Sequence, residues 1–229
     1  MKDGCASRDP RALMHLCMLV SPALPVGAYA YSQGLEYAVQ EDWVRDESST
    51  LEWLNGLARH SVGTLDLPVL LRLHRAWDAG DTAAISHWNA QLIAARETAE
   101  LRAEELHLGR SLARVLAALE ITEASDWLDS GTAFCTMFSL AAVRWRISAA
   151  DTLCGYLWTW SENQVLAAIK LVPLGQSAGQ RILHEMIESM PAIADHAAKL
   201  PDRCIGVGAI LQPIASALHE SQYSRLFRS

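Results

Sequence analysis

The hydrophobic residues recur with helical periodicity along nearly the whole chain, and this feature restricts the fold most strongly. In the stretch 97–119, Leu101, Leu108 and Leu112 are seven and four residues apart and therefore share one face of a helix, which Glu105 interrupts. No segment shows sustained alternation of polar and apolar residues between turn signals, as a half-exposed strand would. The sequence therefore predicts an all-α protein.

Several residues mark where helices begin. Ser49 and Ser148 each stand three residues before an acidic residue, a spacing typical of the capping box. Asp66 precedes the pair Leu67-Pro68 and is expected to cap the helix that starts there. The complete pattern predicts helices over 11–20, 32–41, 50–62, 67–78, 82–95, 97–119, 124–129, 132–146, 149–172, 176–189, 191–199 and 209–220.

Neither a low-complexity linker nor an internal repeat divides the sequence. About half of its residues are hydrophobic (51%), which suffices for a sizeable core. We therefore expect a single domain over 1–229, a helical bundle of about ten helices. The ends, at about 1–9 and about 221–229, are expected to be loose.

Composition also restricts the function. The formal charge is −7 and there is no long basic block, which argues against nucleic acid as a ligand. No apolar run reaches the roughly 18 residues of a membrane span, so no membrane association is expected. The five cysteines are scattered without a C-x-x-C pair, as in a cytoplasmic protein with reduced thiols.

The segment 165–181 departs from the simple helical pattern. Lys170 lies inside an apolar run that ends at a proline, and two glycines and two glutamines follow. Burying an unpaired ammonium or amide group costs several kcal/mol, so such a segment usually faces a polar partner. The alternative for Lys170 is a packed stem with its ammonium in water. For Gln176, Gln180 and Arg181 the alternative is an exposed first helical turn.

Two more segments are unusual. Residues 21–36 combine two prolines and a glycine with aromatic and polar residues, which indicates a non-helical connection. Residues 219–229 combine aromatic and apolar side chains with arginines. Tyrosine and arginine are enriched at interface hot spots, and such a tail can become ordered on a partner. The alternative is a frayed terminus.

The pentapeptide Gly175-Gln176-Ser177-Ala178-Gly179 matches the G-x-S-x-G nucleophile motif of serine hydrolases. Asp195 or Asp202 followed by His219 would complete a triad in the order of that class. The motif needs a preceding strand, however, and the pattern here is helical. A serine hydrolase is therefore the alternative function.

Other catalytic tools are missing from the sequence. There is no H-E-x-x-H motif and no pair of Cys or His residues at helical spacing for a metal. A G-x-x-x-x-G-K-[ST] loop for nucleoside triphosphates is also absent. We expect a protein that is not an enzyme and carries neither a metal site nor a cofactor.

Motifs spread over nearly the whole chain resemble those of the UreF family of urease accessory proteins. They include Ser-Pro-Ala-Leu-Pro-Val-Gly at 21–27, Tyr-Ser-Gln-Gly-Leu-Glu at 31–36 and Ala-Ile-Lys-Leu-Val-Pro-Leu-Gly-Gln at 168–176. The segments 96–102, 162–164 and 219–228 are also similar to the family pattern.

The resemblance implies an all-α, non-catalytic adaptor. Such a protein dimerises and bridges UreD (also called UreH) to the GTPase UreG, so that nickel is inserted into apo-urease in a GTP-dependent manner. In that scheme GTP is bound by UreG, nickel passes through the complex, and this chain holds no cofactor of its own.

The resemblance also assigns residues. Lys170 matches a lysine of the surface that faces the GTPase, and Tyr29 and Glu36 fall in the N-terminal signature, on the dimer or GTPase surface. The segment Tyr223–Arg228 matches the part of the family that is expected to become ordered on UreD. The full set of expected partner-binding residues is Tyr29, Glu36, Lys170, Gln176, Gln180, Arg181, Tyr223, Arg225, Leu226 and Arg228.

Overall fold

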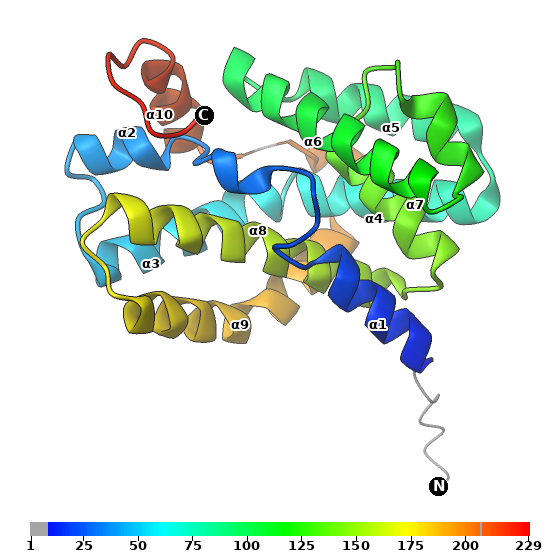
Figure 1. The fold of residues 1–229 in the computed structure, drawn as a ribbon, viewed down its shortest axis with the longest axis horizontal. Coiled ribbons are helices and arrows are strands. Elements are labelled where there is room, and N and C mark those ends of the chain that lie inside the picture. The colour runs from blue at the N-terminus through cyan, green and yellow to red at the C-terminus, as the bar shows by residue number, and fades with distance from the viewer. Residues whose placement is uncertain (1–8, 207) are drawn as a thin grey trace, which may run out of the picture.

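The computed structural model describes residues 9–206 and 208–229, and Figure 1 shows their arrangement. These residues form ten α-helices and no strand, which confirms the all-α prediction. The helices are α1 (Pro10–Leu19), α2 (Leu35–Gln40), α3 (Glu47–Leu57), α4 (Asp66–Ala79), α5 (Thr82–Ala94), α6 (Ala99–Ala118), α7 (Phe134–Arg144), α8 (Ala149–Leu171), α9 (Gln176–Lys199) and α10 (Leu211–His219).

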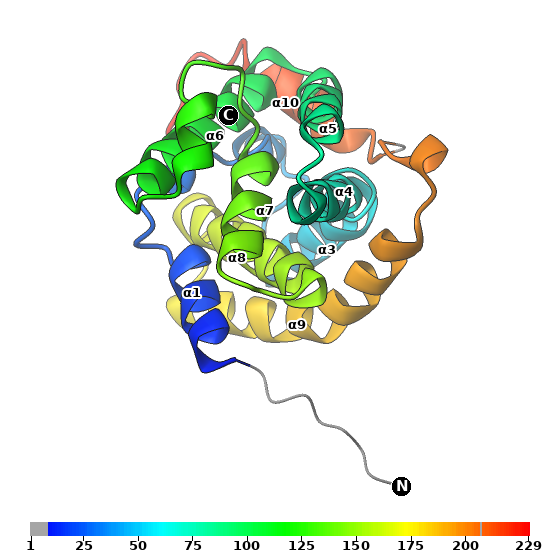
Figure 2. The same ribbon diagram turned by 90° about the vertical axis from the view of Figure 1, so that its right-hand side faces the viewer.

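Helices α4 and α7 form the centre of the bundle. Figure 2 looks along α4 and shows it surrounded by α3, α5, α7 and α9. Leu67, Leu70 and Leu73 are fully buried on α4, and α7 is buried nearly all round over Phe134–Ala142. A helix that is apolar on all sides belongs inside a protein. The other helices form a shell around this pair.

Helices α8 and α9 form an antiparallel pair that positions the segment 165–181. Gly179 makes their close approach possible, because a Cβ atom there would lie 2.5 Å from Cδ1 of Ile169. Gly175, in contrast, has open space around it. Among the described residues, no helix is both long and apolar enough to cross a membrane.

Some predicted helix boundaries were wrong. The two helices expected over 176–189 and 191–199 are one helix, α9, with Pro191 inside it. Met190, Ile193 and Ala194 are buried around the proline, and this packing outweighs the missing backbone donor. Helix α3 begins before Ser49, whose amide and hydroxyl form a capping box with Asp46.

The capping interaction of Ser148 is confirmed. Its hydroxyl accepts a hydrogen bond of 3.1 Å from the amide of Asp151 at the start of α8. Asp66 differs from its expected role, because it is the first residue of α4 and its side chain is buried.

The end of the chain is more ordered than the sequence suggests. We call residues 221–229 the tail. Phe227 is buried with Leu35, Ala38 and Val172 in a second, smaller apolar cluster between α2 and α8, and Ser229 is also buried. The tail therefore differs from the expected loose end. The expected loose N-terminal segment, about 1–9, lies outside the described residues except for Asp9, which caps α1.

Gly109 of α6 lies against the backbone just before α7, so a substitution there tests how closely the two helices pack. A Cβ atom at this position would lie 1.9 Å from the carbonyl oxygen of Thr132, so the backbone before α7 must move. We predict that Gly109→Ala lowers the free energy of unfolding by about 1–3 kcal/mol in urea denaturation. The matched control is Gly56→Ala in α3, where nothing lies within 4 Å of the added methyl group. The control should leave stability unchanged or raise it by about 0.5–1 kcal/mol. Equal effects of the two substitutions would contradict this packing.

Candidate functional site

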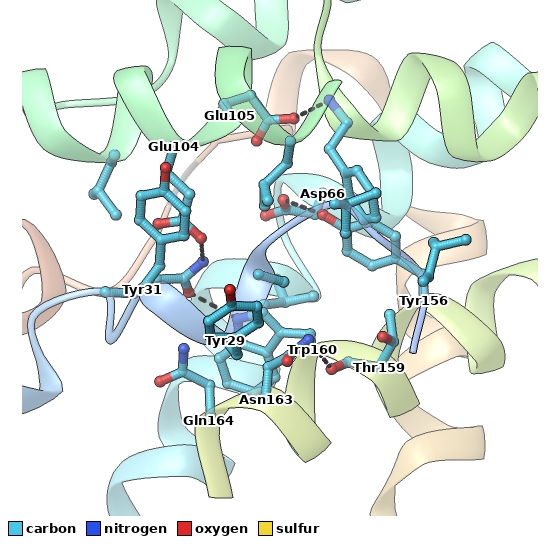
Figure 3. A pocket seen from close by; sticks show the side chains of 18 of the residues that line it. Tyr29, Tyr31, Asp66, Glu104, Glu105, Tyr156, Thr159, Trp160, Asn163 and Gln164 are labelled. Carbon is cyan, nitrogen blue, oxygen red and sulfur yellow. Dashed lines mark hydrogen bonds between the residues drawn. The ribbon is translucent and has the colours of Figure 1, made fainter. Parts of the chain in front are cut away.

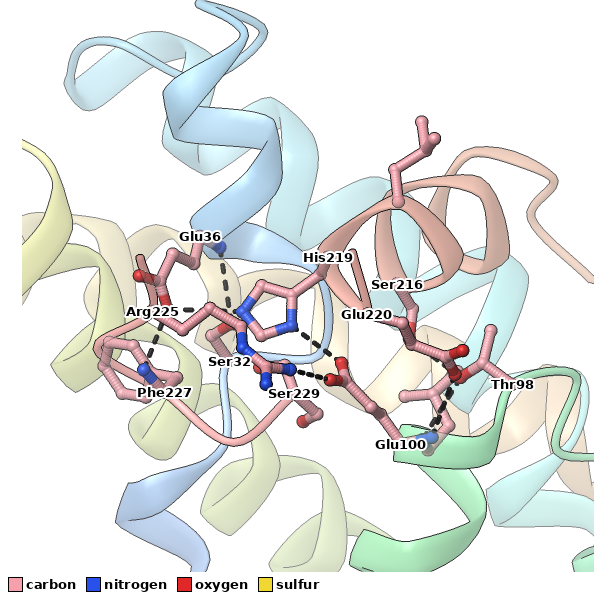
Figure 4. A network of polar contacts seen from close by, with 12 residues as sticks. Ser32, Glu36, Thr98, Glu100, Ser216, His219, Glu220, Arg225, Phe227 and Ser229 are labelled. Carbon is pink, nitrogen blue, oxygen red and sulfur yellow. Dashed lines mark hydrogen bonds and ion pairs between the residues drawn. The ribbon is translucent and has the colours of Figure 1, made fainter. Parts of the chain in front are cut away.

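The carboxylate of Glu36 fixes the tail. One of its oxygens accepts a hydrogen bond of 2.7 Å from the amide of Leu226, and the other accepts one of 2.8 Å from the amide of Phe227. Figure 4 shows this contact beside α10. Hydrogen bonds to an ionised group are stronger than neutral ones, so one side chain of α2 sets the position of two successive peptide units.

A buried histidine extends this network. His219 lies between Glu36 and Glu100, with its Nε2 3.4 Å from one carboxylate and its Nδ1 2.7 Å from the other (Figure 4). Arg225 of the tail donates a hydrogen bond of 2.6 Å to Glu100. Glu220 accepts from the amide of Ala99 at 2.9 Å, at the start of α6. The network therefore joins the tail to α2, α6 and α10.

The structure brings Lys170 and the tail together. The side-chain nitrogen of Lys170 lies 5.6 Å from the centre of the Phe227 ring, a distance typical of a cation–π contact. Lys170 is exposed, so its ammonium also reaches water, as in the alternative that the sequence left open. Two segments that were predicted separately thus form one surface.

The remaining predicted residues lie in different settings. Gln176 and Gln180 are exposed in the first turns of α9, and Arg181 forms a bidentate ion pair with Glu47 of α3 at 2.6–2.7 Å. Tyr29 is 65% exposed. Of the tail side chains, Tyr223, Arg225, Leu226 and Arg228 are exposed, whereas Glu36 is buried and already bonded within the chain.

The sequence did not predict a cavity that lies between the segment before α2, helix α6 and helix α8. Its volume is about 90 Å³, room for several water molecules. Tyr29 and Tyr31 line the cavity, together with Glu104 of α6 and Gln164 of α8 (Figure 3). The signal was present in the sequence, because acidic residues interrupt the apolar stripe of α6 at Glu104-Glu105.

Arg96 organises the charges at one side of the cavity. It forms ion pairs with Asp66 of α4 and Glu105 of α6, and all three side chains are largely buried. The hydroxyl of Tyr156 donates a hydrogen bond of 3.0 Å to Asp66. Burial raises the pKa of Tyr156 well above its usual value, so the phenol remains a donor.

Glu104 is the other buried carboxyl group of the cavity. It accepts hydrogen bonds from Gln33 at 2.8 Å and from the hydroxyl of Ser229 at 3.0 Å. Burial raises the pKa of Glu104 to about 7, although these two hydrogen bonds oppose the shift. Its charge state is therefore set by burial and by the docked tail.

The geometry does not assemble a serine hydrolase. Ser177 lies in the first turn of α9, which follows a loop and not a strand. Both ring nitrogens of His219 face carboxylates, and Asp202 is paired with Arg72 at 2.8 Å. Among the residues that the structure describes, no three His, Cys, Asp or Glu side chains are grouped so that they could hold a metal ion.

Comparison with known proteins identifies the family. The UreF family model matches residues 44–187, which is more than half of the chain. The chain belongs to the UreF family. A protein named urease accessory protein UreF from Teredinibacter turnerae is 52% identical over 95% of this chain and 98% of its own length.

Two further proteins of the same name support the assignment. The UreF of Alkalilimnicola ehrlichii is 48% identical over 95% of this chain and 96% of its own length. The UreF of Chromohalobacter salexigens is 44% identical over 98% of this chain and 97% of its own length. The resemblance inferred from the sequence motifs is thereby confirmed.

The Arg96 cluster can be tested by substitution. Arg96→Ala would leave the carboxylates of Asp66 and Glu105 buried without a cation, and breaking a buried pair typically costs about 3–5 kcal/mol. We predict a loss of that size in urea denaturation at pH 7. The control is Arg45→Ala, because Arg45 is exposed and lies 3.9 Å from Asp46, which is also exposed. The Arg45→Ala variant should leave the free energy of unfolding nearly unchanged. If the two variants unfold at the same urea concentration, the cluster does not stabilise the bundle.

Proposed function

We propose that this UreF-family chain acts in urease maturation as a non-catalytic adaptor. It bridges UreD (UreH) and the GTPase UreG, and thereby supports GTP-dependent insertion of nickel into apo-urease. The relatives named above carry the name urease accessory protein, which supports the maturation role. In this proposal UreG binds GTP, nickel is cargo of the complex, the chain acts as a homodimer, and the complex is cytoplasmic.

The observation that carries the adaptor role is the surface formed by Lys170 and the tail. Tyr223 and Leu226 are 105% and 67% exposed, although the backbone beside Leu226 is fixed by Glu36. A fixed backbone that displays an aromatic and an apolar side chain lowers the entropy lost on binding. Such residues are common binding hot spots.

We assign different parts of the surface to different partners. The tail side chains Tyr223, Arg225, Leu226 and Arg228 are proposed to bind UreD. Tyr29 and Lys170, together with Gln176, Gln180 and Arg181, are proposed to face UreG or the second copy of this chain. The carboxylate of Glu36 acts indirectly, because it holds the tail in place.

The role of Lys170 can be tested without disturbing the fold. Its ammonium is exposed, so Lys170→Ala should leave the melting temperature within a few degrees of the wild-type value. We predict that this variant changes the GTPase rate of UreG in the complex and lowers urease activation in a reconstituted assay. The control is Lys199→Ala, at the exposed end of α9. Unchanged urease activation in Lys170→Ala would remove Lys170 from the proposed surface.

The tail can be tested at its exposed side chains. In Tyr223→Ala/Leu226→Ala the contacts of Phe227 and the backbone bonds to Glu36 are kept, and only displayed surface is lost. We predict that affinity for UreD falls at least about tenfold, as for the loss of a small hot spot. The control is Ile187→Ala, an exposed side chain of α9. Deleting 223–229 should have the same or a larger effect, and full co-purification of the deleted chain with UreD would contradict the assignment.

A further inference from the structure

The cavity between the segment before α2, α6 and α8 carries more negative than positive charge. Asp66, Glu104 and Glu105 line it, and each of them is at most 5% exposed. Among the described residues that line the cavity, Arg96 is the only cation, and it pairs with Asp66 and Glu105. One guanidinium group therefore faces two carboxylates even when Glu104 is neutral, and the wall has a net negative charge in either state of Glu104.

The hydrogen-bond donors of the wall are already used within the wall. The guanidinium group of Arg96 donates to both of its carboxylate partners. The other bonds run from Tyr156 to Asp66, from Gln33 to Glu104, from Trp160 to Gln33, from Ser61 to Gln212, and from Asn163 to the carbonyl oxygen of Thr159. A ligand in this cavity therefore meets acceptors more readily than free donors.

One acceptor of the wall is left without a partner. The side-chain carbonyl oxygen of Gln164 on α8 is buried and accepts no hydrogen bond from any described residue. Gln164 is 2% exposed and lines the cavity (Figure 3). Buried acceptors without a partner are rare in native proteins, so this oxygen points to a bound molecule that donates a hydrogen bond.

The size of the cavity limits the ligand. Its volume of about 90 Å³ is smaller than the roughly 150 Å³ of a cavity that binds benzene. Tyr29 and Leu166 line the cavity and are 65% and 37% exposed, so the cavity opens to solvent beside them. The ligand is therefore an ion or molecule of a few heavy atoms that enters from solvent.

Charge and hydrogen bonding together select the kind of ligand. The carboxylates repel an anion. The described residues offer no group of three His, Cys, Asp or Glu side chains, and so no ligand set for a divalent metal ion. Water satisfies the free acceptor but leaves the negative charge without a counter-ion. A small cation with N–H groups satisfies both, and aromatic walls such as those of Tyr29 and Trp160 suit a cation.

We propose that this cavity binds a small cation that donates hydrogen bonds, of which ammonium is the simplest. Its N–H groups donate to the carbonyl oxygen of Gln164 and to the carboxyl group of Glu104. Glu104 is the counter-ion, because its own two hydrogen bonds come from neutral groups, the amide of Gln33 and the hydroxyl of Ser229. The site lies within one chain, so binding does not depend on the adaptor role.

The first experiment compares the melting temperature of the full chain at pH 7 in ammonium chloride and in potassium chloride, each at about 100 mM. Potassium is a cation of similar size that donates no hydrogen bond. For a dissociation constant on the order of 10 mM, ammonium should raise the melting temperature by about 3–6 °C relative to potassium. Tetramethylammonium, which has no N–H group, should behave like potassium.

The same series decides against the proposal as clearly as for it. Equal melting temperatures in all three salts would mean that the cavity holds water only. An equal rise in ammonium and potassium would mean that it takes any small cation, and an equal rise in ammonium and tetramethylammonium would mean that aromatic contacts alone select the ligand. Each of these results overturns the proposal, and none of them requires a variant that folds.

A second experiment places ammonium in the cavity. The indole N–H signal of Trp160, which lines the cavity, is followed by NMR as ammonium replaces potassium at constant ionic strength. We predict that Glu104→Gln weakens ammonium binding about tenfold or more, as for the loss of a hydrogen bond to a charged group. The matched control is Glu162→Gln, since Glu162 lies on α8 but does not line the cavity. It should leave the affinity within about twofold.

Gln164→Leu separates binding from a structural role. Because its carbonyl oxygen has no partner in the described chain, this substitution should leave the melting temperature in potassium chloride unchanged or raise it. The additional rise in ammonium chloride should disappear. An ammonium effect that persists in both Gln164→Leu and Glu104→Gln would place the ion elsewhere and overturn the proposal.

Discussion

The buried ion cluster around Arg96 is the interaction on which the rest of the structure depends. Asp66 lies at the start of α4, Glu105 in the middle of α6, and Tyr156 on α8 bonds to the same aspartate. The other oxygen of Glu105 accepts a hydrogen bond of 2.6 Å from the amide of Phe134 at the start of α7. The cluster around this guanidinium group thus links the four helices α4, α6, α7 and α8. A buried charge cluster is costly unless it is fully bonded, which restricts these helices to one arrangement.

That arrangement also creates the displayed surface. With α6 in place, Glu104 and Glu100 project toward α2 and α10, and the tail closes over them with Phe227 between α2 and α8. Lys170, at the end of α8, then lies beside the Phe227 ring. The carboxyl groups of Glu36, Glu100 and Glu104 thus hold the segment that displays the exposed side chains.

Much of the fold could be predicted from the sequence, because amphipathic periodicity reports helices directly. The predictions that failed concern features that depend on contacts between residues far apart in the sequence. Helix α9 continues through Pro191 because the residues around the proline are buried. The local sequence does not predict this burial. Glu36 and Leu226 are 190 residues apart, so their hydrogen bond could not be read from either motif. The acidic residues in the stripe of α6 were visible, but their buried partners were not.

The most direct test of the adaptor role is the mass of the complex that this chain forms. It would be co-expressed with its cognate UreD and UreG and analysed by size exclusion with light scattering at low salt. The account predicts a stable hetero-oligomer built on a dimer of this chain, which Phe227→Ala weakens because the tail is no longer held. A chain that elutes alone, with neither partner, would contradict the account.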